Sequence, residues 1–224
     1  MSEETRTHKI LEGIVGSTAH GLATPDSDKD VAGVFGYATE VFWELKEPKM
    51  SIVKTNPDST HHEILKFIKL ASSANPNILE LLWLPTYTYQ NLDGYNLVKI
   101  RQAFLSQRVQ VAYIGYAESQ FRKLMQRGDS FSSGTKNRTN KHARHLFRLM
   151  EQGQHLYTTG ELNVRVNNPE DYLRYNTMTT DQIQEEFVKK YDLFLDTKTA
   201  LPKEPDWETL EEYLYDYRLG NITH

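Results

Sequence analysis

The chain has 224 residues, of which 38% are hydrophobic and 25% charged, and its formal net charge at pH 7 is −4. That length suits one domain, or a catalytic domain with a helical companion, and the mild negative charge neither announces nor excludes a nucleic-acid partner. The absence of cysteine excludes disulfides and cysteine-bound zinc, which favours a cytoplasmic protein. Residues 1–7 are polar and no segment approaches a membrane-spanning apolar run, so we expect no membrane partner.

The most informative stretch begins where an apolar run, predicted to be a buried strand, ends at Gly16 and Ser17. A Gly-Ser pair lets the backbone approach a phosphate closely, and the following residues could offer N–H groups from a helix start. Asp28 and Asp30 precede a second predicted strand over residues 31–35, and alternate strand residues share a face. We therefore expect both carboxylates to point the same way and bracket divalent ions, as two-metal phosphoryl or nucleotidyl transfer requires. A surface turn rich in Asp, Ser and Pro is the alternative.

These residues carry a resemblance to a known family. Gly16-Ser17, ten further residues and then Asp28-Lys29-Asp30 resemble the signature of the polymerase-β nucleotidyltransferase superfamily. The fuller pattern Gly-Ser-x-x-His-Gly-Leu, which includes His20, is similar to its RNA-ligase-associated, RNA-repair branch. The resemblance implies an α/β (α+β) fold with a small mixed sheet and a mainly helical C-terminal part. Lys29 is a departure, since the superfamily often has an apolar residue there.

The superfamily also needs a third carboxylate from a neighbouring strand. The resembled branch places an acid, a short strand, a second acid, a Lys-Phe helix and Asn-Pro-Asn in that order, and this chain matches the order. The resemblance therefore implies Asp58 as the third metal ligand, with Glu63 in reserve. The residues alone do not separate the two, because Asp58 could start a turn and Glu63 could be a helix first-turn acid.

The predicted helix after Glu63 has an apolar face, shared by Ile64, Phe67, Ile68 and Ala71, with Lys66 on the opposite side. Asn75-Pro76 is expected to stop this helix and start the next, which halts before Pro85. His61 and His62 suggest zinc, but adjacent strand residues face opposite ways, which favours partly exposed strand histidines.

Residues 97–127 have the spacing of one long helix or two, ending at a Gly128 cap, with an aromatic stripe that we assign to the core rather than to base stacking. The small polar residues 128–134 predict a loop, either a lid or a mobile connection.

The next predicted helix, residues 137–151, has two faces. Ala143, Leu146, Phe147 and Met150 form the core face, and the donors on the other face are Arg138, Lys141, His142, His145 and Arg148. The resemblance implies that Lys141, His142, His145 and Arg148 contact a triphosphate or nucleic acid; a solvated helix face is the alternative.

The remaining residues, 159–224, are predicted to be helical and supportive, with caps at Thr180-Asp181 and Asp206 and an acidic last helix that ends at Gly220. The chain is thus divided into a catalytic core over residues 1–96 and a helical domain over residues 97–224 that completes the cleft.

The activity implied by the resemblance is transfer of a nucleoside monophosphate from an NTP to an acceptor hydroxyl, with release of pyrophosphate. It implies two Mg²⁺ ions, with Mn²⁺ as a substitute, held by Asp28, Asp30 and Asp58. The implied phosphate and substrate contacts are Gly16, Ser17, His20, Lys66 and the four donors at 141–148. An RNA 3′ end or tRNA is the expected acceptor and an RNA ligase the expected functional partner. The alternatives are a nucleotidyltransferase of a toxin–antitoxin or phage-defence pair, and a non-catalytic nucleotide- or RNA-binding module.

Overall fold

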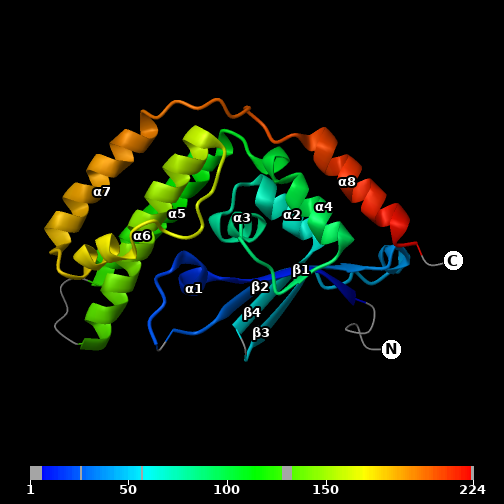
Figure 1. Cartoon of the computed structure of the whole chain (residues 1–224), viewed down its shortest axis with the longest axis horizontal. Helices are drawn as coiled ribbons and strands as arrows, with labels where there is room; N and C mark the ends of the chain where they lie inside the picture. Colours follow the sequence, from blue (N-terminus) through cyan, green and yellow to red (C-terminus); the bar gives the residue numbers. More distant parts are fainter. Residues whose placement is uncertain (1–6, 26, 57, 128–132, 223–224) are drawn as a thin grey trace. The chain divides into compact units, whose positions relative to one another are not determined.

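The computed structural model describes residues 7–25, 27–56, 58–127 and 133–222; of residues 127 and 133–140 only the backbone is described. The chain forms two compact units (Figure 1). The sheet unit comprises residues 1–105 and 204–224, and the helical unit comprises residues 106–203. The division predicted at residue 96 differs from this, because the end of the chain returns to the sheet unit. There, the Asp206 N–H donates to the Ala103 carbonyl over 2.9 Å and the Tyr213 hydroxyl donates to the Asp93 carbonyl over 3.0 Å.

The sheet unit is built on a mixed five-stranded sheet in the order β3-β4-β2-β1-β5. Its strands are β1 (Thr7–Val15), β2 (Asp30–Tyr37), β3 (Ser51–Thr55), β4 (Asp58–Glu63) and β5 (Tyr89–Gln90). β2 and β4 are parallel and the other neighbours are antiparallel. The predicted strands before Gly16 and over residues 31–35 are confirmed, as is the small mixed sheet.

Three helices cover one face of this sheet: α2 (Ile64–Ser72), α3 (Pro76–Leu82) and α4 (Leu92–Lys99) (Figure 1). The predicted apolar face of α2 is confirmed, since Ile64, Phe67, Ile68 and Ala71 are all buried. Asn75 caps α3 by accepting the Asn77 N–H, with Pro76 in the first turn as predicted, and the helix ends at Leu82.

A buried ion pair attaches α8 (Trp207–Gly220) to the start of α2. Glu63 is fully buried and caps α2: its Oε2 accepts the Leu65 N–H over 2.7 Å and its Oε1 accepts from Arg218 Nη2 over 2.5 Å. The Arg218 guanidinium also lies over the ring of Phe42, a residue of the short helix η2 (Thr39–Trp43), at 4.1 Å from the ring centroid. Burial raises the pKa of the Glu63 carboxyl, and the Arg218 charge opposes that rise. Glu63 is thus the N-cap of α2, one residue before the first turn in which it was predicted as an alternative to its role as a reserve ligand.

The helical unit contains α5 (Arg108–Arg127), α6 (Ser133–Thr159), η4 (Pro169–Asn176) and α7 (Thr180–Leu195). α5 and α6 pack closely at Gly153, because this residue has no side chain. An added Cβ there would lie 2.6 Å from the Tyr113 side chain, so only glycine allows the approach. Tyr113 is buried with Val109, Ala117 and Leu124 along one side of α5, so this aromatic residue lies in the core as predicted, whereas Tyr116 and Phe121 are only partly buried.

Several predicted element ends differ in the structure. Of the two alternatives for residues 97–127, one helix or two, the structure has two: α4 ends at Lys99 and the short η3 (Arg101–Phe104) separates it from α5. α7 is capped by Thr179 rather than Thr180-Asp181, since only Thr179 has the capping-box partner Gln182 three residues later. α8 has the predicted ends: Asp206 caps it and Gly220 closes it. The predicted Gly128 cap and most of the 128–134 loop lie outside the described residues, and α6 begins at Ser133. Within the described helices, none is both long and apolar enough to cross a membrane.

Arg218→Ala tests the buried ion pair. It leaves the Glu63 carboxylate buried without its partner, and we expect a loss of unfolding free energy of about 3–5 kcal/mol at pH 7. Chemical denaturation of the purified variant measures it.

The pH dependence follows from the raised pKa of Glu63. A carboxyl with a higher pKa in the folded state contributes most stability below its ordinary value of 4.5 and loses it as pH rises through the folded pKa. Without Arg218 that pKa rises further, so the deficit should grow as pH rises from 4.5 and shrink below it. Adding Glu63→Gln to Arg218→Ala should remove this pH dependence. An equal deficit at every pH would contradict the assignment.

Candidate functional site

Two of the three predicted carboxylates lie on neighbouring strands. Val31 on β2 is opposite Ser59 on the parallel strand β4, so Asp30 and Asp58 are adjacent one residue before that pair. Residues in register on parallel strands project from the same face, and neighbouring strands are about 4.8 Å apart. The register therefore brings Asp30 and Asp58 together at one end of the sheet.

The Gly-Ser turn lies at the same end. β1 ends with Val15 opposite Asp30, and Gly16 immediately starts the short helix α1 (Gly16–His20). Gly16 has a φ of +66°, and a Cβ there would overlap the Asp30 carboxylate. The first N–H groups of a helix have no partner within it, so Ser17 lies where a phosphate could accept them beside a carboxylate.

Asp28 differs from its predicted place. It is exposed and precedes β2 rather than lying within it. β1 has already ended opposite Asp30, so β1 offers Asp28 no partner. A local turn, in which Ser27 Oγ accepts the Thr24 N–H over 2.9 Å, leads the chain into the strand instead. Asp28 thus reaches this end of the sheet from a loop, and strand alternation does not fix its direction.

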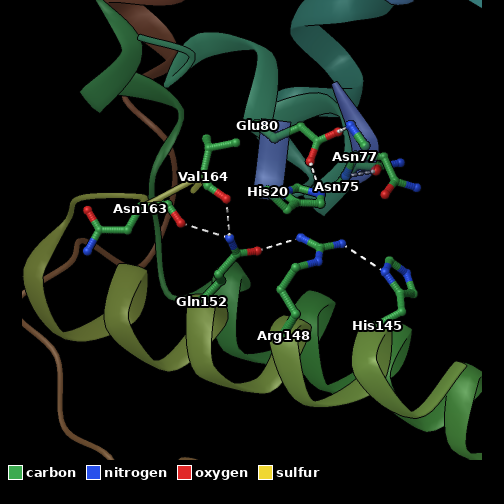
Figure 2. A network of polar contacts seen from close by, with 10 residues as sticks. His20, Asn75, Asn77, Glu80, His145, Arg148, Gln152, Asn163 and Val164 are labelled. Atoms are coloured by element: carbon green, nitrogen blue, oxygen red, sulfur yellow. Dashed lines mark hydrogen bonds and ion pairs between the residues drawn. The ribbon is translucent and has the colours of Figure 1, made fainter. Parts of the chain in front are cut away.

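A buried carboxylate that the sequence analysis did not single out holds the turn from behind. Glu80 on α3 is 6% exposed; its Oε1 accepts the Gly16 N–H over 3.4 Å and its Oε2 lies 3.2 Å from His20 Nε2 (Figure 2). The carboxylate therefore connects both ends of α1 to α3. The available signal was a single acid inside the apolar run of residues 78–82, since an acid there is buried and needs a partner.

His20 consequently has a different place from the predicted phosphate contact. It is 4% exposed and its Nε2 faces Glu80, so its ring supports the turn from inside the unit. The resemblance implies a phosphate contact for this histidine because it is part of the Gly-Ser-x-x-His-Gly-Leu pattern. One helical turn separates it from Gly16, which directs its side chain toward α3.

Lys66 and Glu63 lie at the other end of β4. The strand begins at Asp58 and α2 starts directly after Glu63, so the two acids are five residue steps apart along the strand, at about 3.3 Å a step. An odd separation also places Asp58 and Glu63 on opposite faces. Lys66 Nζ donates to Ser51 Oγ over 2.8 Å near the same end. The structure brings neither Lys66 nor the reserve ligand Glu63 to Asp30.

The strand histidines point in opposite directions, as predicted. His61 Nε2 lies 2.8 Å from Glu12 Oε2, whereas His62 Nδ1 lies 2.8 Å from Ser51 Oγ. Burial lowers the pKa of His62, with a further decrease from the charge of Lys66. Each ring has its own partner, which fits structural histidines rather than a shared zinc site.

In the helical unit, α6 has the predicted core face, since Ala143, Leu146, Phe147 and Met150 are buried. On the other side Lys141 is exposed, and His142 is partly buried with its Nδ1 2.9 Å from Gln120 Oε1 on α5. The side chain of Arg138 is not among those described.

Arg148 does not lie on an exposed donor face of α6, although the sequence predicts that it does. It is 5% exposed, and its guanidinium donates to Gln152 Oε1 over 2.5 Å and to His145 Nδ1 over 2.8 Å (Figure 2). A guanidinium cannot accept a hydrogen bond, so His145 Nδ1 accepts, and the ring is neutral with its proton on Nε2. Gln152 Nε2 in turn donates to the carbonyls of Asn163 and Val164. Arg148 thus holds a buried network together, a role that helical spacing alone does not reveal.

The donor set at the carboxylate end suits a hard cation. Within the described part of the chain, no three His, Asp or Glu side chains lie close enough together to hold a metal ion. Mg²⁺, however, is commonly held by one or two carboxylates together with substrate phosphates and water. Asp30 and Asp58 beside the Gly16 turn fit that requirement, with Asp28 reaching the same end from its loop.

Gly16→Ala tests the close approach of the turn to Asp30. The substitution places a side chain at positive φ, which costs about 1–2 kcal/mol, and displaces the carboxylate. Gly115→Ala on α5 is the control, because its Cβ would meet nothing within 4 Å. In a helix it should be neutral or stabilising by about 0.5–1 kcal/mol. Urea unfolding measures both; equal effects would refute the close approach.

Arg148→Ala compared with Lys141→Ala tests the buried network. Removing Arg148 leaves the polar groups of His145 and Gln152 without a donor, and we expect a loss of about 1–3 kcal/mol of unfolding free energy. Lys141 is exposed, so its removal should change stability by less than about 0.5 kcal/mol. Similar stability of both variants would return Arg148 to the predicted solvated face.

Comparison with known proteins places this geometry in a family. A family model described as "RNA repair pathway DNA polymerase beta family" matches residues 1–190. No curated protein matches. One similar solved structure is a nucleotidyltransferase-like protein from Exiguobacterium sibiricum 255-15, with 14% identity, 95% of this chain and 73% of that chain covered, and a TM-score of 0.36. By the family match over most of its length, and with the Gly-Ser turn beside strand carboxylates, the chain belongs to the RNA repair pathway DNA polymerase beta family and is a nucleotidyltransferase.

Proposed function

We propose that the protein transfers a nucleoside monophosphate from an NTP to the 3′ hydroxyl of an RNA, releasing pyrophosphate in a metal-dependent reaction. The observation that carries the proposal is the convergence of the Gly16 turn, Asp30 and Asp58 at one end of the sheet. This end of the sheet offers the two kinds of group that the reaction needs: backbone N–H groups that bind phosphate oxygens, and carboxylates that bind the cations accompanying the phosphates.

The expected metal is Mg²⁺, with Mn²⁺ as a substitute. Asp30 and Asp58 would hold it, and Asp28 would join them from its loop. When bound, the metal supplies a Lewis acid that favours ionisation of the acceptor hydroxyl and neutralises the charge on the leaving pyrophosphate. Ser17 and the N–H groups after Gly16 would hold the terminal phosphates, and Glu80 would keep that turn in place.

The distribution of charge supports an RNA acceptor. Residues 106–203 contain 15 lysines and arginines against 11 aspartates and glutamates, a formal charge of +4, whereas the rest of the chain contains 11 against 19, a charge of −8. A net basic helical unit within an acidic chain suits a phosphate backbone, which binds through cations in a salt-dependent way. Exposed Lys141 would contact phosphates directly.

Asp30→Asn and Asp58→Asn should each lower the rate of nucleotidyl transfer by about 10²–10³-fold, the scale of removing one electrostatic contact from a reacting centre. Both keep the size of the side chain and remove only its charge. Release of pyrophosphate from labelled NTPs, with Mg²⁺ and single-stranded RNA, duplex RNA, DNA or tRNA as acceptor, measures the rate.

Two matched variants control this experiment. Glu63→Gln lies at the other end of β4 and should leave the rate per folded molecule unchanged, and Asp192→Asn removes an exposed carboxylate of the helical unit. A larger loss from Glu63→Gln than from Asp58→Asn would contradict the assigned ligands. Absence of pyrophosphate release with every NTP and acceptor would leave a binding module instead.

A further inference from the structure

The helical unit contains a polar pocket of about 480 Å³ that none of the roles above uses. Its walls come from the end of α6, from residues 163–168 and from η4, all within residues 106–203. Pockets for small organic ligands span roughly 300–1,000 Å³, so this volume is enough for one nucleotide unit.

Buried hydrogen bonds hold these walls in place. Gln152, which is 7% exposed, fixes the segment by donating to the carbonyls of Asn163 and Val164 over 2.7 and 2.9 Å (Figure 2). Glu151 accepts a hydrogen bond from the Tyr172 hydroxyl and another from Lys190 Nζ over 3.1 Å. Its negative charge is therefore already paired, and the pocket is built before any ligand arrives.

An aromatic and cationic surface forms part of the pocket. The Tyr175 ring stacks on Phe147 at 4.1 Å between centroids, and the Arg174 guanidinium lies 4.8 Å from the Tyr175 centroid. Burial raises the pKa of Tyr175 to about 12, so its hydroxyl stays protonated at neutral pH. A planar guanidinium stacked on an aromatic ring is a surface on which an unpaired base can stack.

Four further polar side chains of the lining are open to a ligand. Arg165, Asn167, Asn168 and Asp171 make no side-chain hydrogen bond or ion pair with any part of the chain that the structure describes. A site for a bare anion would offer donors alone, and a site for a cation would offer acceptors alone. This set instead offers a cation, two amides and a carboxylate, which fits a ligand with a phosphate and with both donors and acceptors on a planar ring.

We propose that this pocket binds one unpaired nucleotide of the acceptor RNA. Arg165 holds its phosphate, the amides and Asp171 read the edge of its base, and the exposed Arg174 guanidinium, which lies on the buried Tyr175 ring, stacks on its face. That the ligand is a nucleotide is inferred from the pocket alone, whereas the inference that this nucleotide belongs to the acceptor RNA rests on the proposed function.

Fluorescence anisotropy of a labelled single-stranded RNA, with full-length protein in EDTA, tests the pocket without catalysis. Arg165→Ala should weaken RNA affinity about tenfold, because it removes a charged hydrogen-bond donor, and Asn168→Ala about fivefold. Arg122→Ala is the matched control: it removes the same charge from an exposed position on α5 outside the pocket, and affinity should change less than about twofold. All three residues are exposed, so the thermal unfolding midpoints should match wild type.

Competition identifies the ligand. Nucleoside monophosphates should displace the labelled RNA from wild type, and inorganic phosphate at the same concentration should not. Equal losses from Arg165→Ala and Arg122→Ala would show general charge attraction and overturn the proposal. Equal competition by phosphate would reduce the pocket to an anion site and overturn it too. If Arg165→Ala weakens monophosphate binding but leaves RNA affinity intact, the assignment to RNA fails.

The two proposals can fail separately. Asp30→Asn should bind RNA as wild type does while losing transfer. RNA binding that depends on Arg165, without transfer to any acceptor, would refute the proposed function and leave the pocket. Transfer to RNA that Arg165→Ala and Asn168→Ala leave unchanged, in both affinity and KM, would refute the pocket and leave the function.

Discussion

The parallel pairing of β2 with β4 is the constraint on which the candidate active site depends. It sets Asp30 beside Asp58, and the antiparallel pairing of β1 with β2 ends where the turn at Gly16 begins. A shift of one residue in either register would send a carboxylate to the opposite face of the sheet. The two strand pairings therefore fix the relative positions of Gly16, Asp30 and Asp58.

Buried charges stabilise the junctions between this sheet and its helices. Glu80 connects α3 to both ends of α1, and Glu63 connects the start of α2 to Arg218 on α8. A buried carboxylate requires a partner, so each acid is satisfied in one arrangement of its neighbours and disfavours others. The last helix of the chain belongs to the sheet unit for this reason, although its sequence suggests only a supporting role.

The helical unit shows the same principle with other groups. Arg148, His145 and Gln152 form a chain of hydrogen bonds that ends on the backbone carbonyls of Asn163 and Val164. Those hydrogen bonds fix the start of the segment 163–168, which forms one wall of the polar pocket. Arg148, which was predicted to face a substrate, thus holds the helical unit together. The polar side chains that are open to a ligand, such as Arg165, come after α6 in the chain.

The sequence by itself determined the elements whose signals are local: the strands beside the Gly-Ser turn, the apolar faces of α2 and α6, and the caps Asn75 and Asp206. A family signature contained in residues 16–30 also needs no tertiary information. Only the tertiary structure shows that Asp58, rather than Glu63, lies beside Asp30, because register and strand direction relate residues far apart in the chain. It likewise decided that His20 and Arg148 are buried, since helical spacing gives the direction of a side chain but not what lies opposite it.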